Sequence, residues 1–265
     1  MDVQNISVTI LTKNSQKYLK EVLQALSSFG EVLVYDTGSL DDTVSIAKTF
    51  PNVNVVEASF VGFGPTHNMA SSRAKHTWIL SIDSDEIISK ELLNELKEIE
   101  QDDMAVYSFP RRNYYNGKWI KGCGLFPDRQ KRLYNKQSTR FTDSVAYESI
   151  ISDGMRDVAC KGMISHYPFT TISDFLAKMQ SYSSYFAEQN RGRKKSSPIK
   201  ACLHGCFAFM KSYFLKAGLF YGYEGFVISL YQGHTAYYKY IKLHEANLKL
   251  KKKSNLMLNR DHSSG

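Results

Sequence analysis

Short apolar runs recur along the first hundred residues of the chain. Residues 6–11 and 31–35 form continuous runs rich in β-branched side chains, and similar runs follow at 53–56 and 77–82. Uninterrupted runs of this length predict strands that are buried on both faces of a sheet.

The segments between these runs have the spacing of amphipathic helices. Serine is a preferred N-cap residue, and proline is favoured in the first helical turn. Strands that alternate with helices predict an α/β fold, in which a mixed, mainly parallel sheet is flanked by helices. The predicted helix starts are at Ser15, Ser39, Pro65 and Ser89.

The pattern changes after about Met104. Short strand-like runs continue to about Val145, and Asn116-Gly117 predicts the turn of a hairpin over residues 114–119. We therefore expect a partly antiparallel extension of the sheet in this half of the chain.

Helical character dominates the rest of the sequence. A helix is predicted from Thr171 to about Gln189, and residues 191–198 (RGRKKSSP) form a basic linker. The segment 199–250 is helical, with breaks around Gly218 and at 222–225. The predicted division is a catalytic domain at 1–190, with halves at 1–103 and 104–190, a C-terminal helical extension at 191–260 and a flexible tail at 261–265.

Charge is distributed unevenly over the 265 residues. Residues 1–190 carry 20 basic and 23 acidic side chains, whereas residues 191–260 carry 14 basic and 2 acidic ones. Such asymmetry indicates an anionic partner near the C-terminus. No nucleic-acid recognition module is visible, so we expect an anionic membrane surface rather than nucleic acid.

The aromatic content of the C-terminal extension fits this expectation. Many tyrosines and phenylalanines alternate there with lysines, as in helices that lie in the headgroup region of a membrane. The competing interpretation is a helical hairpin packed on the catalytic domain. No run of about 18 apolar residues and no signal peptide is visible, so we expect a cytoplasmic protein that is peripheral at a membrane surface.

Polar residues follow three of the predicted strands. Thr12, Asp36 and Asp83 each stand at a carboxyl end, where ligands of parallel sheets bind. Asp83 and Asp85 form a carboxylate pair suited to Mg²⁺ or Mn²⁺, which prefer oxygen ligands. The alternative is a solvated acidic turn that caps a helix.

Three stretches carry a family resemblance: ISVTILTKN, VYDTGSLDDT and HNMASSRAKHTWILSIDSDE. In order and spacing they resemble the N-terminal half of a family 2 glycosyltransferase, which has the Rossmann-like GT-A fold. The resemblance implies that Thr12, Asn14, Asp36, Asn68 and Asp83 bind the nucleotide-sugar and that Asp85 binds the metal. The chain departs from the family pattern at Thr37 and His67.

The second half resembles the lipopolysaccharide-core β-1,4-glucosyltransferase subgroup. The matching stretches are PDRQKRLYNKQSTRF, VAYESI, ISHYPF, LAKMQSYSSYFAEQ and GYEGF. The resemblance implies inverting transfer of a hexose from a UDP-sugar to a lipid-linked glycan acceptor, such as a lipopolysaccharide or lipooligosaccharide core.

Inverting transfer requires a base that takes the proton of the acceptor hydroxyl. Glu148 occupies the glutamate position of the subgroup and is our first choice, before Asp128 and then Asp143. Arg132 is a candidate fork donor to the diphosphate. His166 is a candidate third metal ligand beside Asp85.

Each of these candidates has a structural alternative. Glu148 would otherwise be a strand-end acid in a salt bridge, Arg132 a surface arginine, and His166 a buried histidine with satisfied hydrogen bonds. Cys202, His204 and Cys206 lack the second ligand pair of a zinc site.

Two other functions compete with sugar transfer. A nucleotidyltransferase acting on sugar phosphates has similar phosphate and metal needs, but residues 12–15 lack the glycines of its phosphate loop. The other is a non-catalytic, membrane-associated protein that retains the fold.

Overall fold

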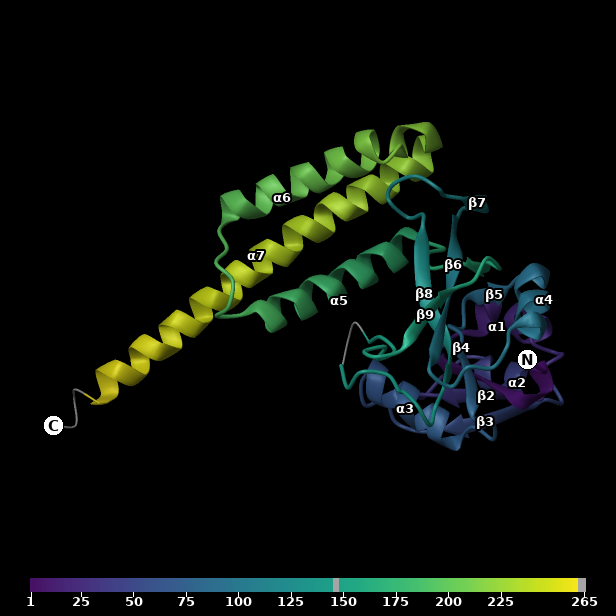
Figure 1. Ribbon diagram of the computed structural model, residues 1–265. Coiled ribbons are helices and arrows are strands. Elements are labelled where there is room, and N and C mark those ends of the chain that lie inside the picture. The colour runs from purple at the N-terminus through teal and green to yellow at the C-terminus, as the bar shows by residue number, and fades with distance from the viewer. Residues whose placement is uncertain (145–147, 262–265) are drawn as a thin grey trace. The chain divides into compact units, whose positions relative to one another are not determined.

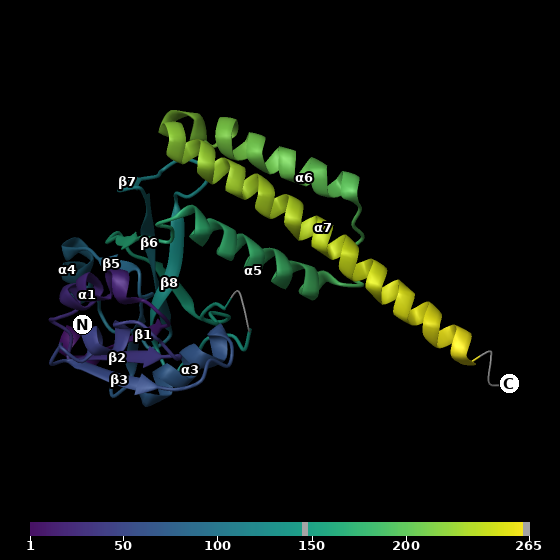
Figure 2. The ribbon, with the colours of Figure 1, turned by 180° about the vertical axis from the view of Figure 1, so that it is seen from behind.

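The computed structural model describes residues 1–144 and 148–261, with the side chains of the last helix described up to residue 252. The chain divides into two compact units (Figures 1 and 2). The first comprises Met1–Asn113 and Pro127–Tyr167, and the second comprises Tyr114–Phe126 and the chain from Pro168 onward.

The first unit is built on a mixed sheet with the strand order β3-β2-β1-β4-β8-β6-β10-β5. β1, β2, β3 and β4 are parallel neighbours, while β8 is antiparallel to both β4 and β6. This arrangement confirms the predicted parallel half with a partly antiparallel extension. The strand bounds are β1 Ile6–Thr12, β2 Glu31–Asp36, β3 Val53–Glu57, β4 Trp78–Ser81, β5 Glu86–Ile88, β6 Ala105–Tyr115, β7 Lys118–Trp119, β8 Asp128–Asn135, β9 Arg156–Ala159 and β10 Ile164–His166.

The helices of the first unit begin close to the predicted positions, with one exception. α4 (Lys90–Glu98) begins at Ser89, whose hydroxyl accepts a hydrogen bond from the Leu92 amide at 3.1 Å. α2 (Thr43–Ala47) begins after Asp42 rather than at Ser39, because Ser39 is bound to Asp36 instead. The remaining helices are α1 (Gln16–Ala25) and α3 (Phe63–Arg73).

The core lies on both faces of the parallel strands, as their continuous apolar runs predict. Alternate residues of β1 and β2 pack with α1, so that Val8, Val34 and Leu23 are fully buried in one cluster. On the opposite face Leu33 and Tyr35 pack with Ala70 of α3. Burial of both faces holds the strand ends in a fixed register, in which Thr12 pairs with Asp36.

A close approach of two segments fixes the start of α3. The Gly64 amide donates to the Ser144 carbonyl at 3.1 Å, and a Cβ at Gly64 would lie 1.8 Å from the Thr142 carbonyl oxygen. Only glycine therefore allows α3 to contact the segment 141–144.

We expect Gly64→Ala to lower the free energy of unfolding by roughly 1–3 kcal/mol, because the added methyl group must displace backbone. Alanine is the better helix former, so a purely local effect would have the opposite sign. Denaturant titration measures the change. Ser72→Ala on the exposed side of the same helix is the control and should stay within ~0.5 kcal/mol of the parent.

The second unit consists mainly of three long helices. α5 (Ile172–Asn190) begins with a capping box at Thr171, and α6 (Pro198–Met210) begins at Ser197. A π-helical turn (Lys211–Leu215) and a 3-10 turn (Gly218–Tyr221) lead into α7 (Gly222–Asp261). The interruptions near Gly218 and Gly222 match the predicted breaks.

α7 packs against both of the other helices and lies between them (Figures 1 and 2). Lys242 of α7 donates to the Gln180 and Ser183 side chains of α5, each at 2.7 Å. α5, which the sequence-based division placed in the first domain, thus belongs to the same compact unit as α6 and α7. No helix within residues 1–144 and 148–261 has the length and apolar character to cross a bilayer.

Candidate active site

The carboxyl ends of β1 and β2 meet at a buried carboxylate. One oxygen of Asp36 accepts from the Gly38 and Ser39 amides at 3.0 and 2.8 Å. The other accepts from the Thr12 hydroxyl at 2.9 Å and from the Ser39 hydroxyl at 2.5 Å. These contacts explain why Ser39 does not cap α2.

The electrostatics of Asp36 follow from this arrangement. Burial alone would raise its pKa, but the hydrogen bonds from Ser39, Thr12 and Gly38 outweigh burial and lower it. Asp36 is therefore an ionised group that fixes the turn after β2. The contact of Thr12 and Asp36 with a nucleotide stays a prediction.

Two asparagines link the loops around this edge. The side-chain oxygen Oδ1 of Asn14 accepts from the Leu40 backbone amide at 2.8 Å, and the backbone amide of Asn14 donates to the Ser39 hydroxyl at 2.8 Å. The side chain of Asn68 binds the Phe141 backbone through both its oxygen (2.9 Å) and its nitrogen (3.0 Å). Both asparagines thus hold loops, and their predicted nucleotide-sugar contacts stay predictions.

The Asp83-Ser84-Asp85 segment forms a tight turn after β4. The Asp83 amide donates to the Glu86 carboxylate at 3.0 Å, and the Glu86 amide donates to the Asp83 carbonyl at 3.0 Å. The Asp85 carbonyl accepts from the Tyr167 amide at 3.0 Å. This bond attaches the turn to the end of β10, whose His166 pairs with Glu86 across the sheet.

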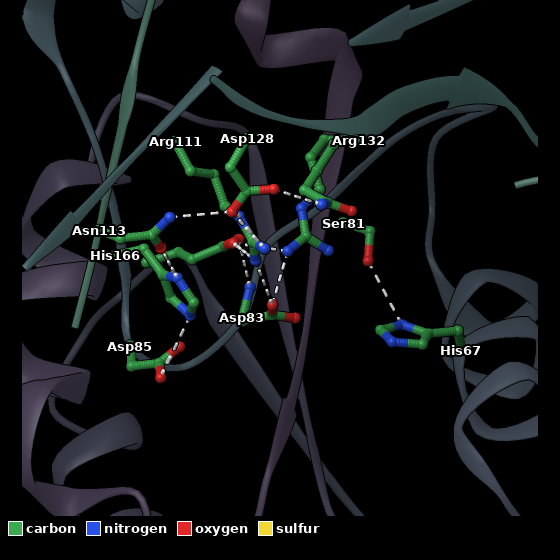
Figure 3. Close-up of polar contacts among 11 residues, drawn as sticks. His67, Ser81, Asp83, Asp85, Arg111, Asn113, Asp128, Arg132 and His166 are labelled. Atoms are coloured by element: carbon green, nitrogen blue, oxygen red, sulfur yellow. Dashed lines mark hydrogen bonds and ion pairs between the residues drawn. The ribbon is translucent and has the colours of Figure 1, made fainter. Parts of the chain in front are cut away.

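Three of the predicted ligands meet at this turn. Asp83, Asp85 and His166 each direct a ligand atom to a region in which these atoms lie within 4.8 Å of one another. His166 Nε2 lies 3.7 Å from an oxygen of Asp85 (Figure 3). The Asp83 and Asp85 side chains are 39% and 33% exposed, so the cluster is accessible from solvent.

A relay of polar side chains sets the tautomer of His166. Its Nδ1 lies 2.6 Å from the side-chain oxygen Oδ1 of Asn113, and the side-chain nitrogen Nδ2 of Asn113 donates to Asp128 at 3.0 Å (Figure 3). Because a carboxylate only accepts, the amide oxygen must face His166, and Nδ1 must carry the proton. In the neutral ring Nε2 then presents its lone pair on the side of Asp85, as a metal ligand does.

Two arginines lie beneath the turn. Arg132, whose side chain is 8% exposed, contacts Asp83 at 2.5 Å and Glu86 at 2.6 Å. Arg111 contacts Glu86 at 3.1 Å and Asp128 at 2.7 Å (Figure 3). Arg132 therefore holds the first aspartate of the turn, and its predicted contact with a diphosphate stays a prediction.

Glu86 and Arg111 were missed in the sequence. Glu86 directly follows the aspartate pair, and Arg111 lies within β6, next to Arg112. The sequence does not indicate that these two residues form a buried ion pair, because Arg111 and Glu86 are 25 positions apart. Asn113 was missed for the same reason.

The donor atoms of this cluster suit a cation. Burial would raise the pKa of Asp83, but Arg132 and Arg111 outweigh it and hold that pKa well below its usual range. Burial raises the pKa of Glu86, which contacts both arginines. The carboxylate oxygens of Asp83 and Asp85 and the imidazole of His166 fit a divalent cation such as Mg²⁺ or Mn²⁺.

His67 adds no charge to this cluster. It stacks on Phe141 with ring centroids 4.3 Å apart, and its Nδ1 lies 3.3 Å from the Ser81 hydroxyl. Burial lowers its pKa to about 4. The residue that departs from the family pattern is therefore a neutral, packed side chain at neutral pH.

The three candidate bases lie in different environments. Asp128 accepts from Arg111 and Asn113 through one oxygen and from Gln130, at 2.8 Å, through the other. Burial would raise its pKa, but Arg111 and these hydrogen bonds lower it. Asp143 is exposed and paired with Arg140. Hydrogen bonds from Arg140 lower the pKa of Asp143 as well, so both carboxylates are weaker bases than a free one.

Glu148 has the opposite character. It is half-buried, and burial raises its pKa; the charge of Asp83 adds to this effect, while its own backbone amide and Arg132 oppose it. A carboxylate with a raised pKa is a stronger base. Among the three candidates the electrostatics favour Glu148, and its role as the base stays a prediction.

The model of the family described as "Glycosyl transferase family 2" matches residues 7–151, which is more than half of the chain. This span contains every residue of the cluster except His166.

Two relatives match almost the whole chain. An uncharacterized glycosyltransferase of Rickettsia prowazekii (strain Madrid E) is 28% identical over 93% of this chain and 89% of its own length. The lipopolysaccharide core biosynthesis glycosyltransferase LpsC of Rhizobium meliloti (strain 1021) is 23% identical over 84% of this chain and 85% of its own.

Among solved structures, the mannosyltransferase PcManGT from Pyrobaculum calidifontis, in complex with GDP-Man and Mn²⁺, is similar with a TM-score of 0.51. It is 15% identical and covers 92% of this chain and 87% of its own. The likeness confirms the predicted fold, a curled and mostly parallel sheet flanked by helices.

Proposed function

The chain belongs to glycosyl transferase family 2, and from this premise we propose that it is an inverting, metal-dependent hexosyltransferase. The proposed donor is a UDP-sugar, and the proposed acceptor is a lipopolysaccharide or lipooligosaccharide core or a related cell-envelope glycan. The observation that carries the proposal is the cluster of Asp83, Asp85 and His166. The similarity to LpsC supports the class of acceptor.

In this proposal Asp83, Asp85 and His166 hold Mg²⁺ or Mn²⁺. A bound cation would neutralise charge that develops on a departing diphosphate. Arg132 and Arg111 keep the Asp83 carboxylate ionised and fixed, and the Asn113 contact selects the tautomer of neutral His166 in which Nε2 can bind a metal. The protein therefore supplies a set of ligands that needs little rearrangement.

Glu148 is the proposed general base. As the acceptor hydroxyl oxygen forms its bond to the anomeric carbon, the bond from that carbon to the diphosphate oxygen breaks, and the hydroxyl proton moves to Glu148. One carboxylate is sufficient, since no covalent intermediate forms. Attack on the face opposite the leaving group inverts the configuration.

The proposed lipid-linked acceptor indicates where in the cell the protein works. A glycan attached to a lipid lies at the surface of a bilayer, so the enzyme must work at that surface. We therefore propose a cytoplasmic protein that is peripheral at the inner membrane.

A thermal-shift screen tests the donor. Ligands that bind only the folded protein raise its melting temperature by mass action. UDP-sugars with Mn²⁺ should give the largest shift among UDP-, GDP-, CMP- and dTDP-sugars, and the shift should fall without metal. A larger shift with GDP-mannose, the ligand of PcManGT, would replace the UDP assignment.

The product formed distinguishes the two competing functions. Sugar transfer releases UDP from a UDP-sugar, whereas a nucleotidyltransferase releases pyrophosphate from a nucleoside triphosphate and a sugar phosphate. A non-catalytic protein releases neither. The proposal is abandoned if pyrophosphate is the product, or if no UDP forms with any acceptor of the stated class.

Asn113→Ala tests the relay that orients His166. Outer contacts of this kind contribute roughly 10–100-fold to metal affinity, so we expect Mn²⁺ to bind weaker by that factor. Electron paramagnetic resonance of free Mn²⁺ measures the change.

Gln130→Ala is the matched control for the relay. It also removes a hydrogen bond to Asp128, of 2.8 Å, but it does not reach His166. It should keep Mn²⁺ affinity within about threefold of the parent, because Asn113 contacts the imidazole of His166 and Gln130 contacts Asp128. Equal losses in the two variants would contradict the relay.

A further inference from the structure

α6 exposes large apolar side chains on the side that faces away from α7. The side packed on α7 includes the buried Ala201 and Gly205 and the ring of His204, which stacks on Tyr240 of α7 at 3.9 Å. A Cβ at Gly205 would lie 3.0 Å from the Cβ of Tyr237, so the two helices are in close contact. The opposite side of α6 and the π-helical turn that follows it carry large apolar residues at intervals of three or four, with 50–74% of their surface exposed: Ile199, Leu203, Phe207, Met210 and Phe214. We call these five residues the outer face.

The outer face continues onto the turns that follow α6. Leu215 is 76% exposed and Phe220 is 83% exposed. Phe214 contacts the ring of Tyr213, which stacks on Phe209 at 5.5 Å. Water-soluble surface helices place such residues toward a core, and continuous exposed apolar patches mark interaction sites.

The charge around the outer face is positive. Between residues 191 and 230 the sequence contains seven lysines and arginines and a single acid, Glu224. Glu224 is 6% exposed and paired with Lys118 at 2.8 Å, so it offers no negative charge to a partner. Lys200 and Lys211 are exposed on the margin of the outer face, one helical step from its apolar residues.

This combination identifies the partner. A second copy of the chain, bound symmetrically through the same face, would bring these lysines against their own equivalents. An anionic bilayer accepts both features, because acyl chains cover apolar residues and phosphate groups attract lysine. Lysine side chains at the margin can extend to the headgroups while their stems stay on the apolar surface.

We propose that the outer face of α6 is a membrane-docking surface for anionic phospholipid, with the helix lying in the plane of the interface. At 1.5 Å per residue α6 is roughly 20 Å long, which suits a helix that lies on a bilayer. The proposal rests on the proposed function, in which the acceptor is attached to a lipid. Membrane binding is measured without a sugar donor and without transfer, so membrane docking and sugar transfer can be disproved separately.

Vesicle flotation with the full chain tests the docking surface. The parent should float with vesicles of phosphatidylglycerol and phosphatidylcholine and much less with phosphatidylcholine alone. Leu203→Glu with Phe207→Glu should reduce binding at least ~tenfold, since two apolar side chains that enter the bilayer become charged. Lys200→Gln with Lys211→Gln should reduce the preference for anionic vesicles.

Leu176→Glu on α5 is the matched control. Leu176 is 54% exposed, and α5 lies on the other side of α7 from α6 (Figures 1 and 2). This variant should bind vesicles as the parent does. Equal loss in Leu176→Glu, or unchanged binding in the double glutamate variant, would overturn the proposal.

A second readout does not depend on a large substitution. Cys206 is exposed on α6 beside the outer face, whereas Cys123 and Cys160 are buried. In Cys202→Ser, an environment-sensitive dye on Cys206 should shift its emission to the blue with anionic vesicles. The dye emission could instead stay unchanged with vesicles and shift to the blue as the protein concentration rises. If light scattering then also detects dimers, the outer face binds a second copy of the chain.

Discussion

Asp85→Ala is expected to reduce sugar transfer by roughly a thousandfold and to abolish metal-dependent nucleotide binding. Asp85 is the carboxylate closest to Nε2 of His166, at 3.7 Å, and its removal leaves Asp83 and His166 as the two remaining ligands. A metal contributes several kcal/mol to stabilising a departing diphosphate, and about 1.4 kcal/mol corresponds to a tenfold change in rate. UDP release and a thermal shift with UDP and Mn²⁺ measure the two effects.

Ser84→Ala is the control for this variant. Ser84 lies between the two aspartates, but its hydroxyl donates to Ser15 at 2.9 Å rather than to the cluster. It should retain transfer within a few-fold and keep the metal-dependent thermal shift. Full activity of Asp85→Ala would remove the metal assignment, whatever the result for Ser84→Ala.

Glu148→Gln is expected to keep donor binding but to lose turnover by roughly 10²–10⁴-fold, the range that a positioned general base contributes. Glutamine retains the shape of the side chain but has no carboxylate to receive the proton. Isothermal titration with UDP and Mn²⁺ should give an unchanged affinity, while UDP release with acceptor falls. A variant that retains turnover would exclude Glu148 as the base.

Asp128→Asn is the comparison for Glu148→Gln. Asp128 is engaged by Arg111, Asn113 and Gln130, so its loss should weaken metal and donor binding rather than the chemical step alone. If Asp128→Asn keeps donor affinity and loses only turnover, the base is Asp128.

The pH dependence gives a second test of the base. Burial and the charge of Asp83 raise the pKa of Glu148 above the ordinary value of 4.5. The base acts only when ionised, so kcat/KM should fall as pH falls through this raised pKa, with the acid limb above pH 4.5. In Glu148→Gln the residual rate should lack this limb.

The parallel half of the fold could be predicted because its information is local. Continuous apolar runs mark the strands, and the residue after each run marks the edge where ligands bind. Thr12, Asp36 and Asp83 could therefore be placed at one edge before their contacts were known. The aspartate pair and His166 were brought together as expected.

The supporting contacts could not be predicted because they depend on distant pairings. The bond of His166 to Asn113 arises where β10 pairs with β6, and no local spacing indicates this register. Asn68 shows the same limit, since its amide is used by Phe141, 73 positions away. Sequence patterns identified which side chains could bind a ligand but not which of them the fold already uses.

The exposed apolar side of α6 is a different case. Its aromatic and lysine content was visible in the sequence, but a packed hairpin and a membrane surface were both compatible with it. The structure packs one side of the helix, at Gly205, on α7 and leaves Phe207 on the other side 62% exposed, and the membrane surface stays a proposal.

Metal-dependent release of UDP tests the proposed chemistry most directly. The parent is incubated with a UDP-hexose and a core oligosaccharide acceptor, first with Mn²⁺, then with excess chelator, and then with Mn²⁺ restored. We predict UDP release that stops with chelator, returns with Mn²⁺ and is absent from Asp85→Ala. Release that continues unchanged in chelator and in Asp85→Ala would contradict a metal site at Asp83, Asp85 and His166.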